Sequence, residues 1–356
     1  MVPPPVPRRM PAEWAPHAAT WLAWPHHEPD WPGKFEPIPW VWVEITRALA
    51  RHERVEIVCV DARAREQARE KLTAHGVHPD GYCLHIARTD RVWLRDSGPI
   101  GVHRADGAVE LLDFGFNAWA KYDDWKHDDE VPGHVAEWTG LPRTVVPRHD
   151  GQGPLVLEGG GIEVNGAGRI MVTEEWLLSD VQVRNPGYGR ADYEREFARW
   201  LGCDETIWLG EGCVGDDTHG HVDDIARFVS PDTVVLAVER DPADDENHRR
   251  SIDNLHRLQA VAGRHGPLRV IELPYPRAVE MDGTRLPASY ANFYIANGVV
   301  IVPTFNDPND RHALNALASC FPDREIVGIH AVDLVWGLGT LHCLSQQQPA
   351  PRSALR

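Results

Sequence analysis

The stretch from Gly337 to Pro349 carries the residue best suited to nucleophilic chemistry, Cys343. It reads Gly-Leu-Gly-Thr-Leu-His-Cys-Leu-Ser-Gln-Gln-Gln-Pro. Apolar and polar residues alternate around the cysteine, which predicts a short strand, and the glutamine run with Pro349 ends it. A lone cysteine is usually a small buried apolar residue. A thiolate at the end of a strand could instead act as a nucleophile in a pocket. Other residues of the chain are needed to distinguish a buried apolar cysteine from a reactive one.

A second chemical group lies between Gly215 and Phe228, where His221 and Asp223 are separated by one residue. In an extended segment their side chains point to the same face, so an imidazole and a carboxylate would share one space. The pair could act as a general base and as a reader of positive charge. Two alternatives stay open: a solvated acidic loop, and a metal-dependent hydrolase in which His219, His221 and Asp223 bind zinc.

Three further polar residues, Asp96, Glu158 and Asn292, lie close in sequence to apolar or aromatic residues and could belong to a functional site. Asp96 follows an expected strand, with Trp93 three residues before it, although Arg95 and Asp96 could also be a surface ion pair. Glu158 ends the apolar stretch 155–158 and precedes three glycines; burying it costs several kcal/mol unless it is paired, which suggests the rim of a functional site. Asn292 lies between aromatic residues and could line a pocket or cap a turn.

A cysteine, a histidine, three carboxylates and an amide form a set that suits attack on a guanidinium carbon. Paired carboxylates can bind a planar guanidinium at several edges and hold it in plane. A thiolate then attacks from above the plane, and a histidine protonates the departing ammonia and later activates water. Free cysteine has a pKa of about 8.5, so an imidazolium or the bound cation must help to ionise it.

Composition restricts the partners. The chain of 356 residues has a formal net charge of −17, which argues against nucleic acid and anionic membrane surfaces and permits a cationic substrate. Its six cysteines form no CxxC pair, so neither a zinc ribbon nor a disulfide framework is expected, and a reducing cytoplasm fits best. No apolar run predicts a signal peptide or a membrane span. The oligomeric state stays open, with a homo-oligomer as one candidate.

Helical and strand patterns alternate along the chain, with about five helices separated by pairs or triplets of strands. A doubly wound sheet would have one strand per helix, and no GxGxxG follows a strand, so that fold is not indicated. We expect one domain over 10–350, with a proline-rich extension at 1–9 and a tail at 351–356. The expected helices cover 39–51, 62–75, 192–201, 245–262 and 312–320, and the expected strands cover 55–60, 82–86, 155–158, 169–173, 206–209, 234–238, 270–273, 294–302 and 325–329.

Ordered motifs over nearly the whole chain resemble the agmatine deiminase family, which includes the bacterial peptidyl-arginine deiminase-like proteins, within the guanidino-group-modifying superfamily. The motifs are Met10-Pro-Ala-Glu-Trp14, Trp21-Leu-Ala-Trp-Pro25, Trp31-Pro-Gly-Lys34, Trp93-Leu-Arg-Asp-Ser-Gly-Pro99, Leu157-Glu-Gly-Gly160, Asp217-Thr-His-Gly-His-Val-Asp-Asp224, Ser289-Tyr-Ala-Asn-Phe293 and His342-Cys-Leu-Ser-Gln-Gln347.

The resemblance implies an α/β fold, a five-bladed α/β propeller or pentein fold, with ββαβ-like modules around a central active site. It implies an amidine hydrolase that needs neither cofactor nor metal and converts agmatine to N-carbamoylputrescine and ammonia. The implied roles are Cys343 as nucleophile, His221 as acid and base, Asp96 and Asp223 as guanidinium readers, Glu158 as partner of the histidine, and Trp93, Asn292, Asp224, Leu338, Gly339 and Thr218 as substrate-binding positions.

Departures from the family pattern make the reaction class better supported than the substrate. Family members usually have three glycines and an asparagine before the Ile-His-Cys, where this chain has Leu338 and Thr340 among the corresponding residues. The segment Thr89-Asp90-Arg91-Val92 stands where an acidic pair is common, and Asp224 stands where many members have asparagine. A compact guanidine, arginine and peptidyl-arginine therefore stay open as substrates, and a non-catalytic binding propeller stays open as a function.

The loop from Phe114 to Asp129 bears on the substrate tail. It contains four aspartates, two tryptophans and no arginine. An acidic aromatic wall suits a second cation better than a carboxylate, so it predicts agmatine over arginine by roughly tenfold, which needs about 1.4 kcal/mol.

Overall fold

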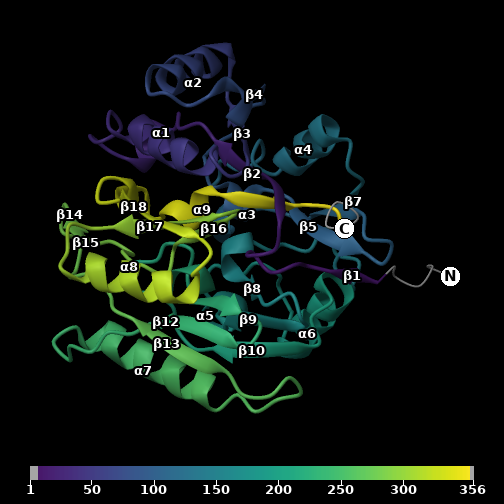
Figure 1. The fold of residues 1–356 in the computed structure, drawn as a ribbon. Coiled ribbons are helices and arrows are strands. Elements are labelled where there is room, and N and C mark those ends of the chain that lie inside the picture. The colour runs from purple at the N-terminus through teal and green to yellow at the C-terminus, as the bar shows by residue number, and fades with distance from the viewer. Residues whose placement is uncertain (1–6, 353–356) are drawn as a thin grey trace.

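The computed structural model describes residues 7–352, and six sheets occur within that range. The smallest is the hairpin of β14 (Glu280–Met281) and β15 (Thr284–Arg285). The other five hold three or four strands each (Figure 1). In sheet order they are β19 (Gln346–Pro349), β2 (His17–Ala23), β3 (Arg54–Cys59) and β4 (Tyr82–Ile86); β1 (Arg8–Arg9), β5 (Ile100–Arg104), β6 (Val109–Asp113) and β7 (Arg143–Val145); β10 (Glu205–Leu209), β9 (Arg169–Thr173) and β8 (Glu163–Val164); β11 (Ala226–Ser230), β12 (Thr233–Ala237) and β13 (Arg269–Leu273); and β16 (Tyr294–Ala296), β17 (Val299–Thr304) and β18 (Glu325–His330).

The five larger sheets share one connection pattern. Each contains an antiparallel pair of strands, and the second strand of that pair then lies parallel to a third. A parallel neighbour needs a crossover, and in each sheet this crossover contains a helix. The helices are α1 (Ile38–Leu49), α4 (Val131–Thr139), α6 (Arg190–Glu196), α7 (Asp245–Gln259) and α8 (Asn309–Cys320), while a further helix, α2 (Ala62–Ala74), leads from β3 to β4.

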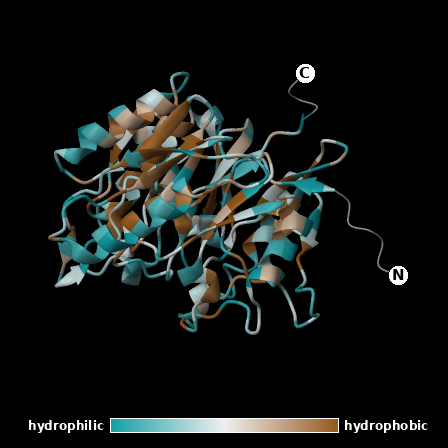
Figure 2. Cartoon of the chain, turned by 90° about the horizontal axis from the view of Figure 1, so that it is seen from below, coloured by the Kyte–Doolittle hydropathy of each residue, from teal (hydrophilic) through white to brown (hydrophobic). Residues whose placement is uncertain are grey.

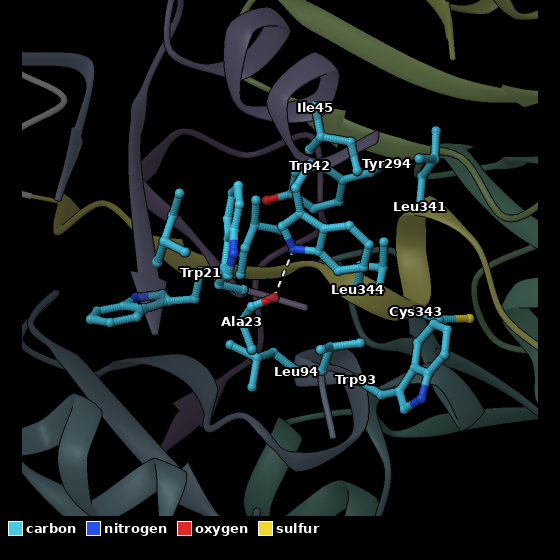
Figure 3. Packing of buried hydrophobic residues seen from close by; sticks show 14 of the residues in the cluster. Trp21, Ala23, Trp42, Ile45, Trp93, Leu94, Tyr294, Leu341, Cys343 and Leu344 are labelled. Carbon is cyan, nitrogen blue, oxygen red and sulfur yellow. Dashed lines mark hydrogen bonds between the residues drawn. The ribbon is translucent and has the colours of Figure 1, made fainter. Parts of the chain in front are cut away.

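Hydrophobic residues concentrate on the strands and on the inner faces of the helices. In α1, Trp42, Ile45 and Leu49 recur at helical spacing and are fully buried. The Trp42 indole N–H donates to the Ala23 carbonyl at 2.7 Å, which fixes the helix on β2 (Figure 3). Figure 2 shows the hydrophobic strands inside and the hydrophilic helix faces outside. No helix between residues 7 and 352 is both long enough and apolar enough to cross a membrane.

Most of the expected elements are present, with ends shifted by at most three residues, but three expectations are wrong. The stretch 155–158 is no strand, because a single isolated bridge forms there, between Val156 and Gly115. The single strand expected over 294–302 is the antiparallel pair β16 and β17, because Asn297 and Gly298, with φ +74° at the glycine, make a tight turn. Cys343 lies on one helical turn, α9 (Leu341–Leu344), and not on a strand.

The N-terminal extension expected at 1–9 also differs. Arg8 and Arg9 form β1 and pair with β5, and the Arg8 guanidinium donates to both oxygens of Glu110 at 2.9 Å. These two residues therefore belong to the sheet. Residues 1–6 of that segment and residues 353–356 of the expected tail lie outside the described range.

Candidate active site

The helical turn α9 presents Cys343 beside the amide of Asn292. The side-chain oxygen of Asn292, Oδ1, accepts from the His342 backbone N–H at 3.1 Å and from the Thr340 hydroxyl at 2.7 Å. Its amide nitrogen lies 3.1 Å from Cys343 Sγ. Asn292 thus holds the turn and touches the sulfur, so the expected placement of Asn292 near the cysteine agrees with the geometry.

Asp223 lies on a 3₁₀ turn, η6 (Val222–Asp224), and His221 directly precedes it, so the two residues are not in one extended segment as we expected. Asp216 sets this turn, because its Oδ2 accepts from the backbone N–H groups of Gly220 and His221 at 2.8 and 3.0 Å. The two side chains still share one space. A Cβ on Gly160 would lie 2.6 Å from His221 Nδ1 and 3.1 Å from Asp223 Oδ2.

Asp96 sits in the short helix α3 (Leu94–Ser97) and is 5% exposed. The Trp119 indole N–H donates to its Oδ2 at 2.9 Å, and the Gly160 backbone N–H donates to its Oδ1 at 3.0 Å. Its Oδ1 also lies 3.7 Å from His221 Nδ1. The carboxylate is therefore held in place from two sides and is not a surface partner of Arg95.

Glu158 lies on the other side of the imidazole. Its Oε2 is 3.8 Å from His221 Nε2 and accepts from the Trp176 indole N–H at 2.8 Å. Its Oε1 accepts from Arg184 Nε at 2.9 Å. Glu158 is fully buried and ion-paired, which meets the condition for burying a carboxylate at this position.

A buried chain of charges fixes Asp223. The two ring nitrogens of His342 contact two carboxylates, Asp223 Oδ2 and Glu13 Oε2, both at 2.7 Å. Glu13 is in turn held by Arg227 at 2.8 Å and Arg95 at 3.3 Å. The other oxygen of Asp223, Oδ1, is buried and has no hydrogen-bond partner in the described range. This arrangement leaves one carboxylate oxygen free to accept an N–H group from a ligand.

Asp224 is a further buried carboxyl close to the sulfur. Its Oδ1 accepts from the Asn292 amide at 3.0 Å. One polar atom from each of Asp223, Asp224 and Cys343 lies within 4.8 Å of the others. The site therefore contains three aspartates, Asp96, Asp223 and Asp224, around a single thiol.

A cavity of about 360 Å³ opens above the sulfur of Cys343. Among the expected site residues, Trp93, Asp96, Thr218, Leu338, Gly339 and Cys343 line it. The others lie directly behind: Asn292 touches the sulfur, Asp224 touches Asn292, and His221, Asp223 and Glu158 form the packed group around Gly160. Figure 3 shows the indole of Trp93 beside Cys343. A Cβ on Gly339 would be 2.8 Å from that indole and 3.1 Å from Cys343 Cβ, so only glycine fits between them.

The acidic wall expected from the loop 114–129 is not present. Asp128 and Asp129 accept backbone N–H groups, from Asp90 at 2.8 Å and from Phe116 at 2.7 Å respectively. Asp124 pairs with Arg91 at 2.8 Å. The loop gives the cavity Trp119 and Tyr122 and no aspartate, and the outer acids of the cavity are Asp30 and Asp217.

Burial and neighbouring charges shift the titration of the site. Burial raises the pKa of Asp96 to about 6, against the attraction of His221. Burial opposes the charged form of His221, but Asp96, Glu158 and Asp223 raise its pKa to about 9. Burial also disfavours the charged form of Glu158, yet Arg184 and His221 lower its pKa to about 2. The imidazole is therefore protonated at neutral pH and can act as an acid.

The thiol of Cys343 is held in its neutral form. Burial raises its pKa well above the ordinary value, and Asp223, Asp224 and Asp96 raise it further. Burial and the neighbouring carboxylates likewise raise the pKa of Asp224 well above its usual range. Cations entering this pocket would relieve the repulsion and favour ionisation of both groups.

The alternative zinc set of His219, His221 and Asp223 does not converge. The ring of His219 turns away, with Nε2 3.0 Å from Ser179 Oγ and Nδ1 3.9 Å from Glu175. Its nitrogens therefore face a different part of the protein from those of His221. The alternative of a solvated loop is also wrong, because His221, Asp223 and Asp224 are all 2% exposed or less.

Sequence reasoning missed several residues that shape the site: Glu13, Arg91, Trp119, Gly160, Arg184 and His342. His342 is next to the cysteine, and Glu13 lies in the motif Met10-Pro-Ala-Glu-Trp14, so both carried a local signal. The positions of Trp119, Gly160 and Arg184 depend on contacts between distant segments, which spacing alone does not reveal.

The fold and the site define a class of mixed α/β proteins with a cysteine, a histidine and several carboxylates gathered at one cavity. Residues 9–349 match the model of the Porphyromonas-type peptidyl-arginine deiminase family, and the chain belongs to that family. It is 35% identical to an agmatine deiminase from Ectopseudomonas mendocina over 97% of this chain and 96% of that one. It is 36% identical to an agmatine deiminase from Pseudomonas aeruginosa, again over 97% and 96% of the two chains. The solved agmatine deiminase of Enterococcus faecalis is 29% identical and superposes with a TM-score of 0.88 over 99% of both chains.

Proposed function

We propose that this protein is an amidine hydrolase that deiminates agmatine to N-carbamoylputrescine and ammonia through a covalent intermediate on Cys343. One observation carries the proposal. A cysteine faces a cavity beside three buried aspartates. Three buried polar atoms of this site, both nitrogens of His221 and Oδ1 of Asp223, have no hydrogen-bond partner within residues 7–352. The free oxygen of Asp223 can accept an N–H group from a guanidinium. The protonated imidazole of His221 can donate a proton to the amino group that leaves as ammonia.

Binding is proposed to come first and to activate the nucleophile. Asp96 and Asp223 accept N–H groups from two edges of the guanidinium, with Asp224 and Asn292 beside them and the indole of Trp93 along the cavity wall. The positive charge of the substrate offsets the carboxylates that raise the pKa of the Cys343 thiol. The thiol proton then leaves to solvent, and the thiolate lies below the guanidinium carbon.

Chemistry then proceeds in two halves. The thiolate bonds to the guanidinium carbon, giving a neutral tetrahedral adduct, and His221 donates a proton to one terminal amino group. Ammonia leaves as its C–N bond breaks, and a cationic S-amidino-cysteine remains. Neutral His221 next removes a proton from water as the water oxygen bonds to the same carbon. The C–S bond breaks and regenerates the Cys343 thiolate, the carbamoyl product loses its remaining proton to solvent, and this proton converts the released ammonia to ammonium.

The connections of the five larger sheets are consistent with the proposed enzyme class. Five sheets with the same antiparallel and parallel connections, each with a crossover helix, are what a five-bladed α/β propeller of ββαβ-like modules would contain. We propose that architecture, with residues 10–350 as one catalytic domain. The six cysteines, all free, fit the reducing cytoplasm that we propose as the compartment.

Ammonia release from agmatine by the purified protein, after exhaustive chelation and without added metal, tests the proposal. Arginine, a blocked arginine peptide and a small guanidine are assayed in parallel, because they are the alternative substrates. Turnover of agmatine that chelation leaves unchanged is expected. Absence of ammonia from every guanidine, or activity that disappears with a removable metal, would contradict the proposal.

A further inference from the structure

The outer part of the cavity contains a cation whose hydrogen-bonding capacity is only partly used. Arg91 lines the cavity, and its side chain is 7% exposed. Its Nε donates to Asp30 Oδ1 at 3.3 Å, and its Nη1 donates to Asp124 Oδ1 at 2.8 Å and to the Asp124 carbonyl at 3.0 Å. The guanidinium carbon lies 4.4 Å from the centre of the Tyr122 ring. For Nη2, the structure between residues 7 and 352 records no hydrogen-bond partner.

The outer carboxylates of the cavity, Asp30 and Asp217, already have hydrogen-bond partners on both oxygens. Both oxygens of Asp217 are engaged, Oδ1 by Lys121 Nζ and Oδ2 by the Tyr122 hydroxyl at 2.6 Å. Oδ1 of Asp30 lies 2.9 Å from His27 Nδ1 and accepts from Arg91, and its Oδ2 accepts from the Trp93 indole N–H at 3.3 Å. An ammonium group entering here would have to compete with cations that already hold these oxygens.

Two carboxylates and an imidazole surround Arg91. Asp30 and Asp124 flank the guanidinium. The His27 ring contacts the same two carboxylates, with Nδ1 2.9 Å from Asp30 Oδ1 and Nε2 3.7 Å from Asp124 Oδ2. The group left for a ligand is therefore the single nitrogen Nη2 of a charged guanidinium, and a charge-assisted hydrogen bond from it to a carboxylate is stronger than one from a neutral donor.

We infer that Arg91 binds the tail of the substrate and that this enzyme accepts ω-guanidino carboxylates, molecules with a guanidinium at one end and a carboxylate at the other. The inference rests on the proposed function, because the guanidinium end must occupy the site around Cys343. Trp93 and Trp119 line the cavity, and their indole N–H groups donate to Asp30 in its outer part and to Asp96 at the reaction site respectively, so the aliphatic linker would lie along these rings. The reaction at the guanidinium carbon is unchanged.

The test compares three linear guanidines that differ mainly in the tail: 4-guanidinobutanoate with a carboxylate, agmatine with an ammonium, and butylguanidine with no charge. We expect 4-guanidinobutanoate to be turned over with a kcat/KM within about tenfold of agmatine or above it. In Arg91→Gln, kcat/KM for 4-guanidinobutanoate falls at least about tenfold, mainly through KM, because a uniform binding contact is lost. Butylguanidine and agmatine should lose less than 4-guanidinobutanoate, so the ratio of their kcat/KM values to that of 4-guanidinobutanoate should rise several-fold.

Arg88→Gln is the matched control, because Arg88 is an exposed arginine in the same segment and does not line the cavity. It should leave all three substrates unaffected. No turnover of 4-guanidinobutanoate by wild type that deiminates agmatine would overturn the inference, as would an equal loss on all three tails in Arg91→Gln. The latter result would mean that Arg91 only supports the fold.

A binding measurement keeps the inference separate from the proposed function. If no guanidine is turned over, the proposed reaction is wrong, and calorimetry on Cys343→Ala with and without Arg91→Gln still reports the tail site. Binding of 4-guanidinobutanoate that weakens at least about tenfold with Arg91→Gln, which is about 1.4 kcal/mol, supports the inference. No binding, or equal binding by the two proteins, contradicts it.

Discussion

Raised pKa values keep the protons on Cys343 and His221 at neutral pH, and the proposed substrate would bring a positive charge to both groups. The thiol has a raised pKa because it is buried among aspartates, and His221 has a raised pKa of about 9 because Asp96, Glu158 and Asp223 outweigh its burial. A guanidinium supplies one positive charge at the centre of these groups. In the proposed mechanism, Cys343 therefore becomes a nucleophile only when a cation binds, and His221 already holds the proton that ammonia needs.

The titration of Asp96 gives a pH prediction. Burial raises its pKa to about 6, and the guanidinium needs the ionised carboxylate. As pH falls through about 6, Asp96 takes up a proton, so kcat/KM for agmatine should decline by about tenfold per pH unit below that value. Trp119→Phe removes a hydrogen bond that favours the ionised form. The acid limb of the pH profile should then move to higher pH.

Asp113→Asn is a matched control for this profile. Burial raises the pKa of Asp113 to about 6 as well, but Asp113 lies on β6 and does not line the active-site cavity. Its loss should leave the acid limb in place. An acid limb that shifts in Asp113→Asn, or that stays fixed in Trp119→Phe, would contradict the assignment to Asp96.

At the level of elements, the short stretch after Glu158 sets the spacing of the acid and the carboxylates. A Cβ at Gly160 would lie 2.6 Å from His221 Nδ1 and 2.8 Å from Asp96 Oδ1. Gly160→Ala must displace one of these groups, and a misplacement of about 1 Å can cost a hundredfold in rate. We expect kcat/KM for agmatine to fall by about a hundredfold or more, measured by ammonia release.

Gly189→Ala provides the comparison for Gly160→Ala. A Cβ there would have its nearest neighbour at 4.0 Å, on Asp192, and the backbone at Gly189 is extended, with φ −117°. The same chemical change should leave the rate within about twofold, because it disturbs no packed group. Similar rates for Gly160→Ala and wild type would show that the acid and the carboxylate are less tightly placed than the structure indicates.

The turn before α9 carries a second constraint at the level of elements. Leu338 has φ +69° and lines the cavity, and a residue with a Cβ pays roughly 1–2 kcal/mol in this left-handed region. Leu338→Gly should change the free energy of unfolding by less than about 1 kcal/mol, because relief of strain is offset by the greater entropy of the unfolded chain. It should raise kcat/KM for agmatine relative to methylguanidine by several-fold, as the cavity widens.

Asn306→Gly is the control for Leu338→Gly. Asn306 is exposed, also has a positive φ, of 56°, and does not line the cavity. It should leave the ratio of agmatine to methylguanidine unchanged. An unchanged ratio in Leu338→Gly would show that the leucine does not limit the substrate.

Most regular helices and strands were predicted correctly from the sequence, whereas the short turns that hold the site residues were not. The strands at 82–86 and 169–173 match β4 and β9, because β-branched or apolar runs bounded by turns report local structure directly. The segment around Cys343 has the same alternation, yet it is a helical turn, because Asn292 from a distant segment accepts its first N–H groups. Long-range contacts of this kind overrode the local pattern.

The candidate site was predictable as a set of residues and less so as an arrangement. Cys343, Asp96, Asp223 and Asn292 do lie together, as the motifs implied. The loop 114–129 was misinterpreted, because the number of aspartates did not show that Asp128 and Asp129 bind backbone N–H groups. Side-chain direction in an irregular loop is set by such hydrogen bonds, which composition does not reveal.

At the level of the whole molecule, segments from both ends of the chain meet at one point. Glu13 contacts His342 at 2.7 Å across 329 positions of sequence, and β19 near the C-terminus pairs with β2 near the N-terminus. The site therefore depends on closure of the whole chain, and Arg227 and Arg95 neutralise the carboxylate that sits at the junction. A chain that folds locally without this closure would not assemble the site.

Mass spectrometry of protein quenched during turnover of agmatine tests the central claim most directly. The account predicts a mass increase equal to agmatine minus ammonia, located on Cys343 after digestion. Cys343→Ala should retain the fold by circular dichroism, show no adduct and release no ammonia. Full activity of Cys343→Ala, or an adduct on another residue of the active wild-type protein, would contradict the covalent role of Cys343.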